Sequence, residues 1–232
     1  ILGGGLSEYL VIPAWQIIRM PHDVDMRHAA LTEPLACCIH SIRKARLKFG
    51  DTVVIIGMGI MGYFHVKLAQ MCGARIIVSE TDEEKRKTAI REGAAYAFDP
   101  RQCDVGEEIR RLTDGLGADA VINTIPFKEV WQQAIDMLAP YGRLIAYSSQ
   151  NSKEPIGVDF GMVHSREIEF IGTLNPTIED NQMAVKLIGY QMIDMEKVID
   201  REFSFAQGKE AFDYACKPGV YRVMINYGKE DN

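Results

Sequence analysis

Short apolar runs alternate with amphipathic helical stretches from residue 51 onward, and this alternation restricts the fold more than any other feature of the chain. Runs such as VVII (53–56) and IIV (76–78) are apolar at every position, so that both faces of each predicted strand are apolar, which is typical of parallel strands covered on both faces. We therefore predict an α/β fold with a doubly wound, six-stranded parallel sheet. The predicted strands cover residues 52–56, 75–79, 96–98, 119–123, 143–148 and 168–172, and the predicted helices cover residues 60–72, 82–92, 105–114, 127–139 and 179–193.

Three glycines directly follow the first of these strands, in the sequence GMGIMG (57–62). Gly57 permits a tight turn from strand to helix, Gly59 lets the backbone approach a pyrophosphate, and Gly62 lets the helix pack closely on the strand. The N-terminus of the following helix offers free N–H groups and a partial positive charge to phosphates. The glycine spacing in this context predicts a dinucleotide-binding turn.

An acid, Glu80, stands at the end of the second predicted strand. At this position a carboxylate would accept hydrogen bonds from the adenosine ribose and repel a 2′-phosphate, so that NAD is favoured over NADP. The alternative interpretation is a glycine turn in another kind of α/β protein, with Glu80 a solvated acid at a strand end. The order strand, glycine turn, helix, strand and acid favours the dinucleotide site.

The two ends of the chain lack the alternating pattern. Residues 6–19 are rich in β-forming residues and contain Pro13, which favours edge strands or a small irregular sheet. The helical stretch that follows is interrupted by Pro34, and Gly50 lies where a helix would stop. After residue 195 the pattern reads strand, helix, turn and strand. We expect both ends to pair in a second, smaller substructure that packs against the sheet.

Composition excludes several classes of function. A formal net charge of −6 over 232 residues argues against nucleic acid or an anionic membrane surface as the main partner. No apolar run approaches the ~18 residues of a membrane-spanning helix. The five cysteines are scattered without a CxxC pair, as expected of reduced intracellular thiols in a cytoplasmic protein.

Together these stretches resemble the medium-chain dehydrogenase/reductase family, specifically its zinc-dependent alcohol, sorbitol and threonine dehydrogenase branch. The segments that carry the resemblance are GGLSEYLVIPA (4–14), LTEPLACCIHSIRKA (31–45), GDTVVIIGMGIMGYFHVKLAQMCGARIIVSE (50–80), GTLNPT (172–177) and KPGVYRVMI (217–225). The resemblance implies a Rossmann domain over residues 46–195 and part of a GroES-like, β-rich catalytic domain formed by residues 1–45 and 196–232.

The resemblance also implies which residues bind the cofactor. Lys85 matches a lysine at the adenosine end, and Arg222 matches an arginine that closes on the pyrophosphate. Thr124 lies in the segment that borders the adenine side, and Thr173 and Leu174 lie in the segment beside the nicotinamide carboxamide. The full predicted set comprises Gly57, Gly59, Ile60, Met61, Gly62, Glu80, Lys85, Thr124, Thr173, Leu174 and Arg222.

Glu33 is the one predicted metal residue, because in this branch EPL occupies the position of a ligand or near-ligand of the catalytic zinc. A carboxylate suits zinc, which binds oxygen ligands in their deprotonated form. The alternative is that Glu33 only caps the helix after Pro34. Cys37, one helical turn further on, would face the nicotinamide pocket or be an ordinary packed thiol.

The family takes its other zinc ligands and its proton relay from an N-terminal segment of about 100 residues, and we find no match to that segment here. Two interpretations follow: an NAD-dependent, zinc-assisted dehydrogenase of an alcohol or polyol that is represented incompletely, or a shortened, non-catalytic dinucleotide-binding module with a regulatory or redox-sensing role. The start inside a β-like segment favours the first. The resemblance further implies a homodimer or homotetramer and no identified catalytic residue in this chain.

Overall fold

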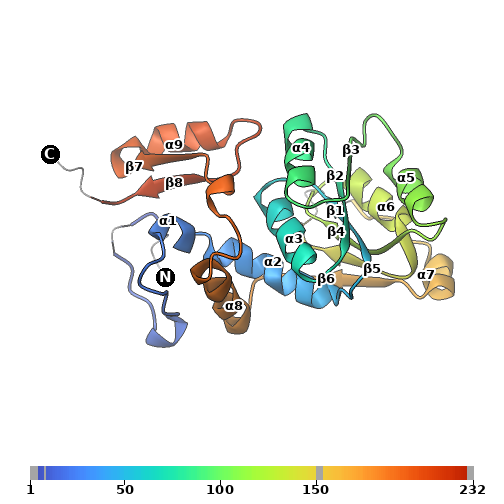
Figure 1. Cartoon of the computed structure of the whole chain (residues 1–232), viewed down its shortest axis with the longest axis horizontal. Helices are drawn as coiled ribbons and strands as arrows, with labels where there is room; N and C mark the ends of the chain where they lie inside the picture. The colour runs from blue at the N-terminus through green and yellow to red at the C-terminus, as the bar shows by residue number, and fades with distance from the viewer. Residues whose placement is uncertain (1–4, 8, 150–153, 229–232) are drawn as a thin grey trace.

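A six-stranded parallel sheet forms the centre of the computed structural model, which describes residues 5–7, 9–149 and 154–228 (Figure 1). The strand order is β3-β2-β1-β4-β5-β6, with every neighbouring pair parallel. Chain order therefore reverses direction between β1 and β4, as in a doubly wound fold. The strands are β1 (Thr52–Ile56), β2 (Arg75–Ser79), β3 (Tyr96–Phe98), β4 (Ala118–Asn123), β5 (Leu138–Ala146) and β6 (Glu169–Gly172). The predicted fold class is confirmed.

Helices cover both faces of the sheet, and each face has its own apolar core. One core includes Leu35, Phe64 and Ile188 and joins the sheet to α2 (Thr32–Ala45), α3 (Ile60–Met71), α4 (Glu83–Arg91) and α8 (Ile178–Gly189). The other includes Ile109 and Trp131 and lies under α5 (Val105–Leu112), α6 (Lys128–Asp136) and α7 (Phe160–Arg166). Burial on both faces explains why β1 is buried at every position.

Side-chain caps fix where several helices begin. Asp82, Asp104 and Asp159 each accept a hydrogen bond from a backbone N–H in the first turn of α4, α5 and α7, respectively. Thr177 and Asp180 form a reciprocal capping box at the start of α8. These caps fix where the helices after β2, β3, β5 and β6 begin.

Asp180 also joins α8 to α2. Its buried carboxylate accepts hydrogen bonds from His40 Nδ1 at 2.8 Å and from Arg43 Nη1 at 2.7 Å, in addition to those from Thr177. Although burial opposes ionisation, these hydrogen bonds hold the pKa of Asp180 at about 2. The helix that precedes β1 is thus fixed to a helix near the other end of the chain.

The outer substructure, at the left of Figure 1, is small. Its strands β7 (Arg201–Ser204) and β8 (Val223–Asn226) pair in parallel, and α9 (Gly208–Ala215) connects them. Near them lies α1 (Met26–Ala29), whose Arg27 contacts Glu202 of β7 at 3.9 Å. Three short 3-10 helices complete the assignment: η1 (Ala14–Gln16), η2 (Glu196–Val198) and η3 (Phe205–Gln207). The expected strand, helix, turn and strand after residue 195 are confirmed.

The N-terminal expectations are partly wrong. Residues 9–19 contain no strand, and residue 8 of the predicted segment lies outside the described part. Val11 and Trp15 are exposed, and neither belongs to a strand in the described residues. Pro34 does not interrupt a helix, because it occupies the first turn of α2, where its missing N–H is not needed. The helix also stops before Gly50, since Arg46 takes a left-handed conformation (φ 49°).

Several boundaries of the elements around the sheet also differ from the prediction, since the helices predicted over 105–114 and 179–193 end at Leu112 and Gly189. The helix predicted over 127–139 ends at Asp136, and β5 begins at Leu138 because that residue pairs with Ala118 at the amino edge of β4. In the apolar run MLA (137–139), Met137 is therefore the C-cap of α6, and Leu138 and Ala139 are strand. Helix α7 was not expected, although its N-cap, Asp159, is a recognisable start signal.

Candidate dinucleotide-binding site

The glycine turn connects β1 to α3 at the carboxyl edge of the sheet, where the chain reverses direction. Gly57 has φ 92°, and its N–H donates to Ser79 O at 2.8 Å. A Cβ at Gly57 would lie 2.6 Å from Thr124 Oγ1, and a Cβ at Gly62 would overlap the carbonyl oxygen of Gly57. Gly59 differs, because a Cβ there would meet nothing within 4 Å. Two glycines thus serve internal packing, while the space at Gly59 is open to a ligand.

The Glu80 carboxylate is bound to this turn. Its Oε2 accepts from Met58 N at 2.6 Å, and its Oε1 accepts from Asp82 N at 2.9 Å and from Thr81 Oγ1 at 3.1 Å. The predicted ribose acid therefore lies directly against the glycine turn, and it also shapes that turn. Sequence reasoning did not anticipate this second role, because no pattern indicates a contact with the amide of Met58.

Hydrogen bonds from polar side chains hold Met61, in the first turn of α3, in place. His65 is fully buried, with Nδ1 at 2.7 Å from Met61 O and Nε2 at 2.9 Å from Ser41 Oγ. A carbonyl only accepts, so Nδ1 carries the proton and Nε2 accepts from the serine. Burial lowers the pKa of His65 to about 4, which keeps the ring neutral. Tyr147, after β5, donates to Met61 Sδ at 3.1 Å.

Other predicted contacts are spread along the same edge. Thr124 follows β4 beside Gly57 and donates to Ile56 O at 2.7 Å. Thr173 follows β6, at the far side of the sheet, and its N–H donates to Ala146 O at 3.2 Å. Leu174 is 85% exposed. The edge therefore carries the predicted adenosine-side and nicotinamide-side residues in the order of the strands, as a dinucleotide lying across it requires.

The outer substructure reaches the adenosine side through one turn. Lys85 Nζ lies 5.1 Å from the ring centre of Tyr221, and the backbone N–H groups of Tyr221 and Arg222 both donate to Asp200 Oδ2. Burial, with the nearby charge of Glu80, raises the pKa of Tyr221 to about 12. The Tyr221 hydroxyl and Arg222 Nε are buried and have no hydrogen-bond partner in the part of the chain that the structure describes. Lys85 thus contacts the residue that directly precedes Arg222 in the chain.

Two arginines that sequence reasoning missed stand beside Glu80. Arg86 Nη1 donates to the carbonyl oxygens of Glu80 and Thr81, both at 2.8 Å, and Arg101 Nη2 also donates to Thr81 O. Arg101 is in the loop between β3 and α5, twenty residues beyond Thr81. Only its place in the folded loop reveals this contact.

The predicted metal residue, Glu33, lies in the first turn of α2. Its Oε1 accepts from Cys37 Sγ at 3.2 Å. Burial, reinforced by this carboxylate, raises the pKa of the Cys37 thiol to about 12, so that the group stays protonated. Zinc takes thiolate and usually has at least three protein ligands. Glu33 and Cys37 do not by themselves make up such a site.

Among the described residues, only Asp25, His28 and Glu196 bring three potential ligand atoms close together. Arg27 fills this cluster, because its Nη2 contacts Asp25 at 2.6 Å and Glu196 at 2.7 Å. The cluster is therefore an ion-pair network that ties α1 to η2. It does not provide the missing ligands for Glu33.

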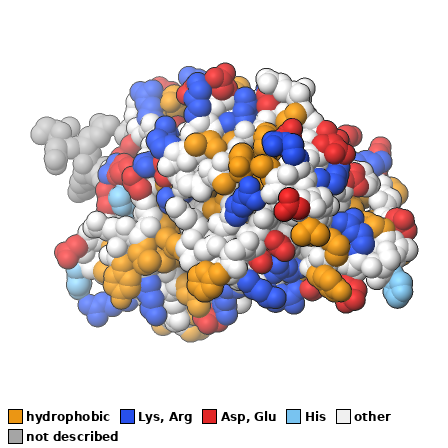
Figure 2. Space-filling model, turned by 45° about the vertical axis from the view of Figure 1, so that its right-hand side comes forward, with side chains coloured by type: hydrophobic (Ala, Val, Ile, Leu, Met, Phe, Trp, Pro, Cys, Tyr) orange, Lys and Arg blue, Asp and Glu red, His pale blue; other side chains and the backbone are white. Residues whose placement is uncertain are grey.

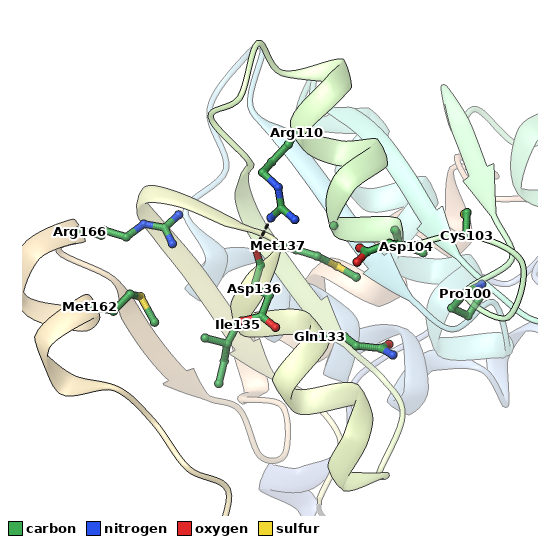
Figure 3. Close-up of a pocket in the computed structure, with 12 residues that line it drawn as sticks. Pro100, Cys103, Asp104, Arg110, Gln133, Ile135, Asp136, Met137, Met162 and Arg166 are labelled. Atoms are coloured by element: carbon green, nitrogen blue, oxygen red, sulfur yellow. Dashed lines mark hydrogen bonds between the residues drawn. The ribbon is translucent and has the colours of Figure 1, made fainter.

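A cavity of about 600 Å³ lies away from the glycine turn, among α5, α6 and α7 (Figure 3). Arg110 points into it and donates to Asp136 O, while Arg166 extends from the opposite wall. Asp104 and Asp136 also line the cavity, so that acidic and basic groups are balanced. Figure 2 likewise shows both charges interspersed over the face in view. Neither feature identifies a ligand.

The sheet order and the glycine turn define the class: a Rossmann-type α/β chain with a glycine turn at the carboxyl edge of its sheet. Residues 60–189 match the family model for zinc-binding dehydrogenases. The chain belongs to the zinc-binding dehydrogenase family, which confirms the resemblance seen in the sequence. No helix in the described part is both long and apolar enough to span a bilayer.

Known relatives include sorbitol dehydrogenase from Halalkalibacterium halodurans, which is 29% identical over 96% of this chain and 65% of its own length. D-arabitol-phosphate dehydrogenase from Enterococcus avium is 26% identical over 98% of this chain and 65% of its own length. A Sinorhizobium meliloti protein assigned to the zinc-binding dehydrogenases was solved bound to NADP; it superposes with a TM-score of 0.90 at 28% identity, covering 96% of this chain and 66% of that one. The chain thus spans about two thirds of the length of these relatives.

Proposed function

We propose that this chain is the cofactor-binding part of an NAD(P)-dependent oxidoreductase that transfers a hydride between an alcohol or polyol carbon and the nicotinamide. The observation that carries this proposal is the glycine turn, with open space at Gly59 and Glu80 beside it. Family membership and the names of the two polyol dehydrogenases support the substrate class. Glu80 favours NAD, and the NADP-bound relative supports a dinucleotide of this type.

Binding would follow from the shape of the carboxyl edge. The backbone at Gly59 caps α3, so the unpaired N–H groups of the first turn face the open space and would hold a pyrophosphate. Glu80 would accept from the adenosine ribose, and the segment at Thr173 and Leu174 would border the nicotinamide. The bound dinucleotide supplies the hydride chemistry, while these residues position it.

The described residues do not complete a zinc site, since Glu33 and Cys37 supply at most two of the three or more protein ligands that zinc takes. That Glu33 contributes to a zinc site, and that zinc assists the complete enzyme, stay predictions. Four further points also stay predictions. These are a cytoplasmic location, assembly as a homodimer or homotetramer, the absence of nucleic-acid and membrane partners, and the division of the chain into three parts at residues 45 and 195.

Fluorescence titration of this chain with NADH tests the proposal directly. We expect saturable binding, and the absence of binding to both NADH and NADPH would contradict it. The non-catalytic alternative is tested by metal analysis and alcohol-oxidation assays on this chain and on the gene-length protein. Metal content and polyol oxidation that appear only in the gene-length protein support the enzyme, whereas NADH binding without either in both forms supports the binding module.

A further inference from the structure

A cavity of about 380 Å³ lies between the N-terminal segment and α8, and none of the residues that line it belongs to the glycine turn. Residues 18–21 form one wall, and the other wall runs from Gln182 of α8 to Tyr190. Figure 1 shows the N-terminal segment beside α8. A Cβ at Gly189 would lie 2.8 Å from Pro21 Cγ, so the glycine lets the two walls meet.

The charged groups of this cavity are all basic. Arg19 and Lys186 line it, and no acidic residue in the described part of the chain does, whereas Asp104 and Asp136 line the cavity of Figure 3. Arg19 Nη2 lies 2.9 Å from His22 Nε2, and neither cation pairs with a carboxylate of the described residues. In a chain with a net charge of −6, two cations without acidic partners favour an anionic ligand.

The other walls of the cavity are mostly apolar, and they continue into a second cavity. Ile18, Met20 and Val185 line both this cavity and an adjoining one of about 530 Å³. The second cavity is also lined by Trp15 and Ile178, which are 69% and 51% exposed. Exposed apolar side chains that gather around a groove mark a binding surface. The groove therefore has cations near one end and apolar walls along its length, which suits an amphipathic anion.

The position of Lys186 favours one kind of anion. Lys186 lies in the last turn of α8. The carbonyl groups at a helix C-terminus carry partial negative charge, which opposes a phosphate dianion more than a singly charged carboxylate. The cavity volume is in the range of small-molecule sites, so that an alkyl chain of about eight carbons can be enclosed.

We propose that this groove binds a medium-chain carboxylate. The carboxylate pairs with Arg19 and Lys186, and the alkyl chain lies along Ile18 and Val185 toward Trp15. This inference is independent of the proposed dinucleotide function, because the groove shares no residue with the glycine turn or with Glu80.

Calorimetric titration of the chain with octanoate tests this inference. The wild type should bind octanoate saturably, and it should bind butanoate at least tenfold more weakly, because four methylene groups are lost from the apolar walls. Octanamide, which keeps the chain and lacks the charge, should bind about tenfold more weakly than octanoate. Octanoate should also shift the fluorescence of Trp15 to shorter wavelength, and Trp15→Phe should remove that shift.

Variants of the charged end separate recognition of the carboxylate from a structural role. Arg19→Gln and Lys186→Gln should each weaken octanoate binding by about fivefold and leave octanamide binding unchanged. Lys186→Arg should restore the affinity. Gln182→Glu, a change of similar size, adds a carboxylate to the wall and should weaken octanoate alone by about fivefold. Lys209→Gln, at an exposed lysine on α9, is the matched control and should change neither affinity.

Three results would overturn the inference. The wild type binds no octanoate, or it binds octanamide or butanoate as tightly as octanoate, or Arg19→Gln and Lys186→Gln both keep the wild-type affinity for octanoate. NADH titration of the same variants reports on the proposed function separately, and we expect unchanged NADH affinity in each.

Discussion

The glycine-turn region and the outer substructure differ in how their buried side-chain groups are hydrogen-bonded. Around the turn, the Glu80 carboxylate, the His65 ring and the Tyr63 hydroxyl all have hydrogen-bond partners, and Tyr63 donates to Asp194 O at 3.0 Å. Within the described residues, the Tyr221 hydroxyl and Arg222 Nε of the outer substructure are buried without one, whereas at the end of β4 only Asn123 Nδ2 is. The turn is therefore shaped by its own sequence before any ligand binds, whereas the outer contacts are incomplete in this chain.

The largest expected effect comes from replacing a glycine whose missing side chain allows close packing in the glycine turn. Gly62→Ala should destabilise the chain by about 3 kcal/mol, because its Cβ would overlap the carbonyl oxygen of Gly57. Chemical denaturation measures the loss. Gly59→Ala is the matched variant: its Cβ meets nothing, so stability should be kept, while NADH binding should weaken by about tenfold or more if a pyrophosphate lies there. Unchanged NADH affinity in Gly59→Ala would place the ligand elsewhere.

A second test uses the buried ring of His65, whose pKa in the folded chain is about 4 against about 6.5 when unfolded. The unfolded chain binds the proton first, so this group costs stability as pH falls from about 6.5 to about 4, by about 3 kcal/mol in total. Unfolding free energies across this interval measure the slope. His65→Gln should flatten it, and an unchanged slope in that variant would assign the pH dependence to other groups.

Replacement of Glu80 tests both of its roles at once. Glu80→Ser removes the acceptor for Met58 N and the predicted ribose contact, so NADH affinity should fall by about tenfold and the NADPH-to-NADH ratio should rise. Fluorescence titration with both cofactors gives the two numbers. If both affinities stay as in the wild type, Glu80 does not face the ribose.

The smallest expected effects come from two tyrosines, one in each region. Tyr63→Phe should cost about 1 kcal/mol, because the hydrogen bond from its hydroxyl to the Asp194 carbonyl is lost. Tyr221→Phe should cost nothing, because its hydroxyl has no partner to lose. Thermal unfolding of the two variants compares them directly. A larger loss for Tyr221→Phe would show that its hydroxyl is satisfied in solution and would weaken the contrast between the regions.

The sequence predicted best what residue identity and short-range pattern determine. The strand limits of β1 and β2 and the turn at Gly57 follow from apolar runs and from the positive φ that glycine alone adopts readily. The strand prediction for residues 9–19 was wrong, because β-forming residues make a strand only when another strand pairs with them. The hydrogen bond from Arg101 to Thr81 O could not be predicted, because it depends on a loop that brings the chain back to Thr81 after twenty residues.

The pairing of α2 with α8 has a consequence for synthesis of the chain. His40 and Asp180 are separated by 140 positions, so the ribosome adds those residues before the partner of α2 exists. At about 5–20 residues per second, this interval lasts roughly 7–28 s. During that time the apolar side of α2, including Leu35 and Ile39, lacks its final cover. A nascent chain of this length is therefore exposed to chaperones and to aggregation at its first long helix, well before the dinucleotide edge of the sheet is complete.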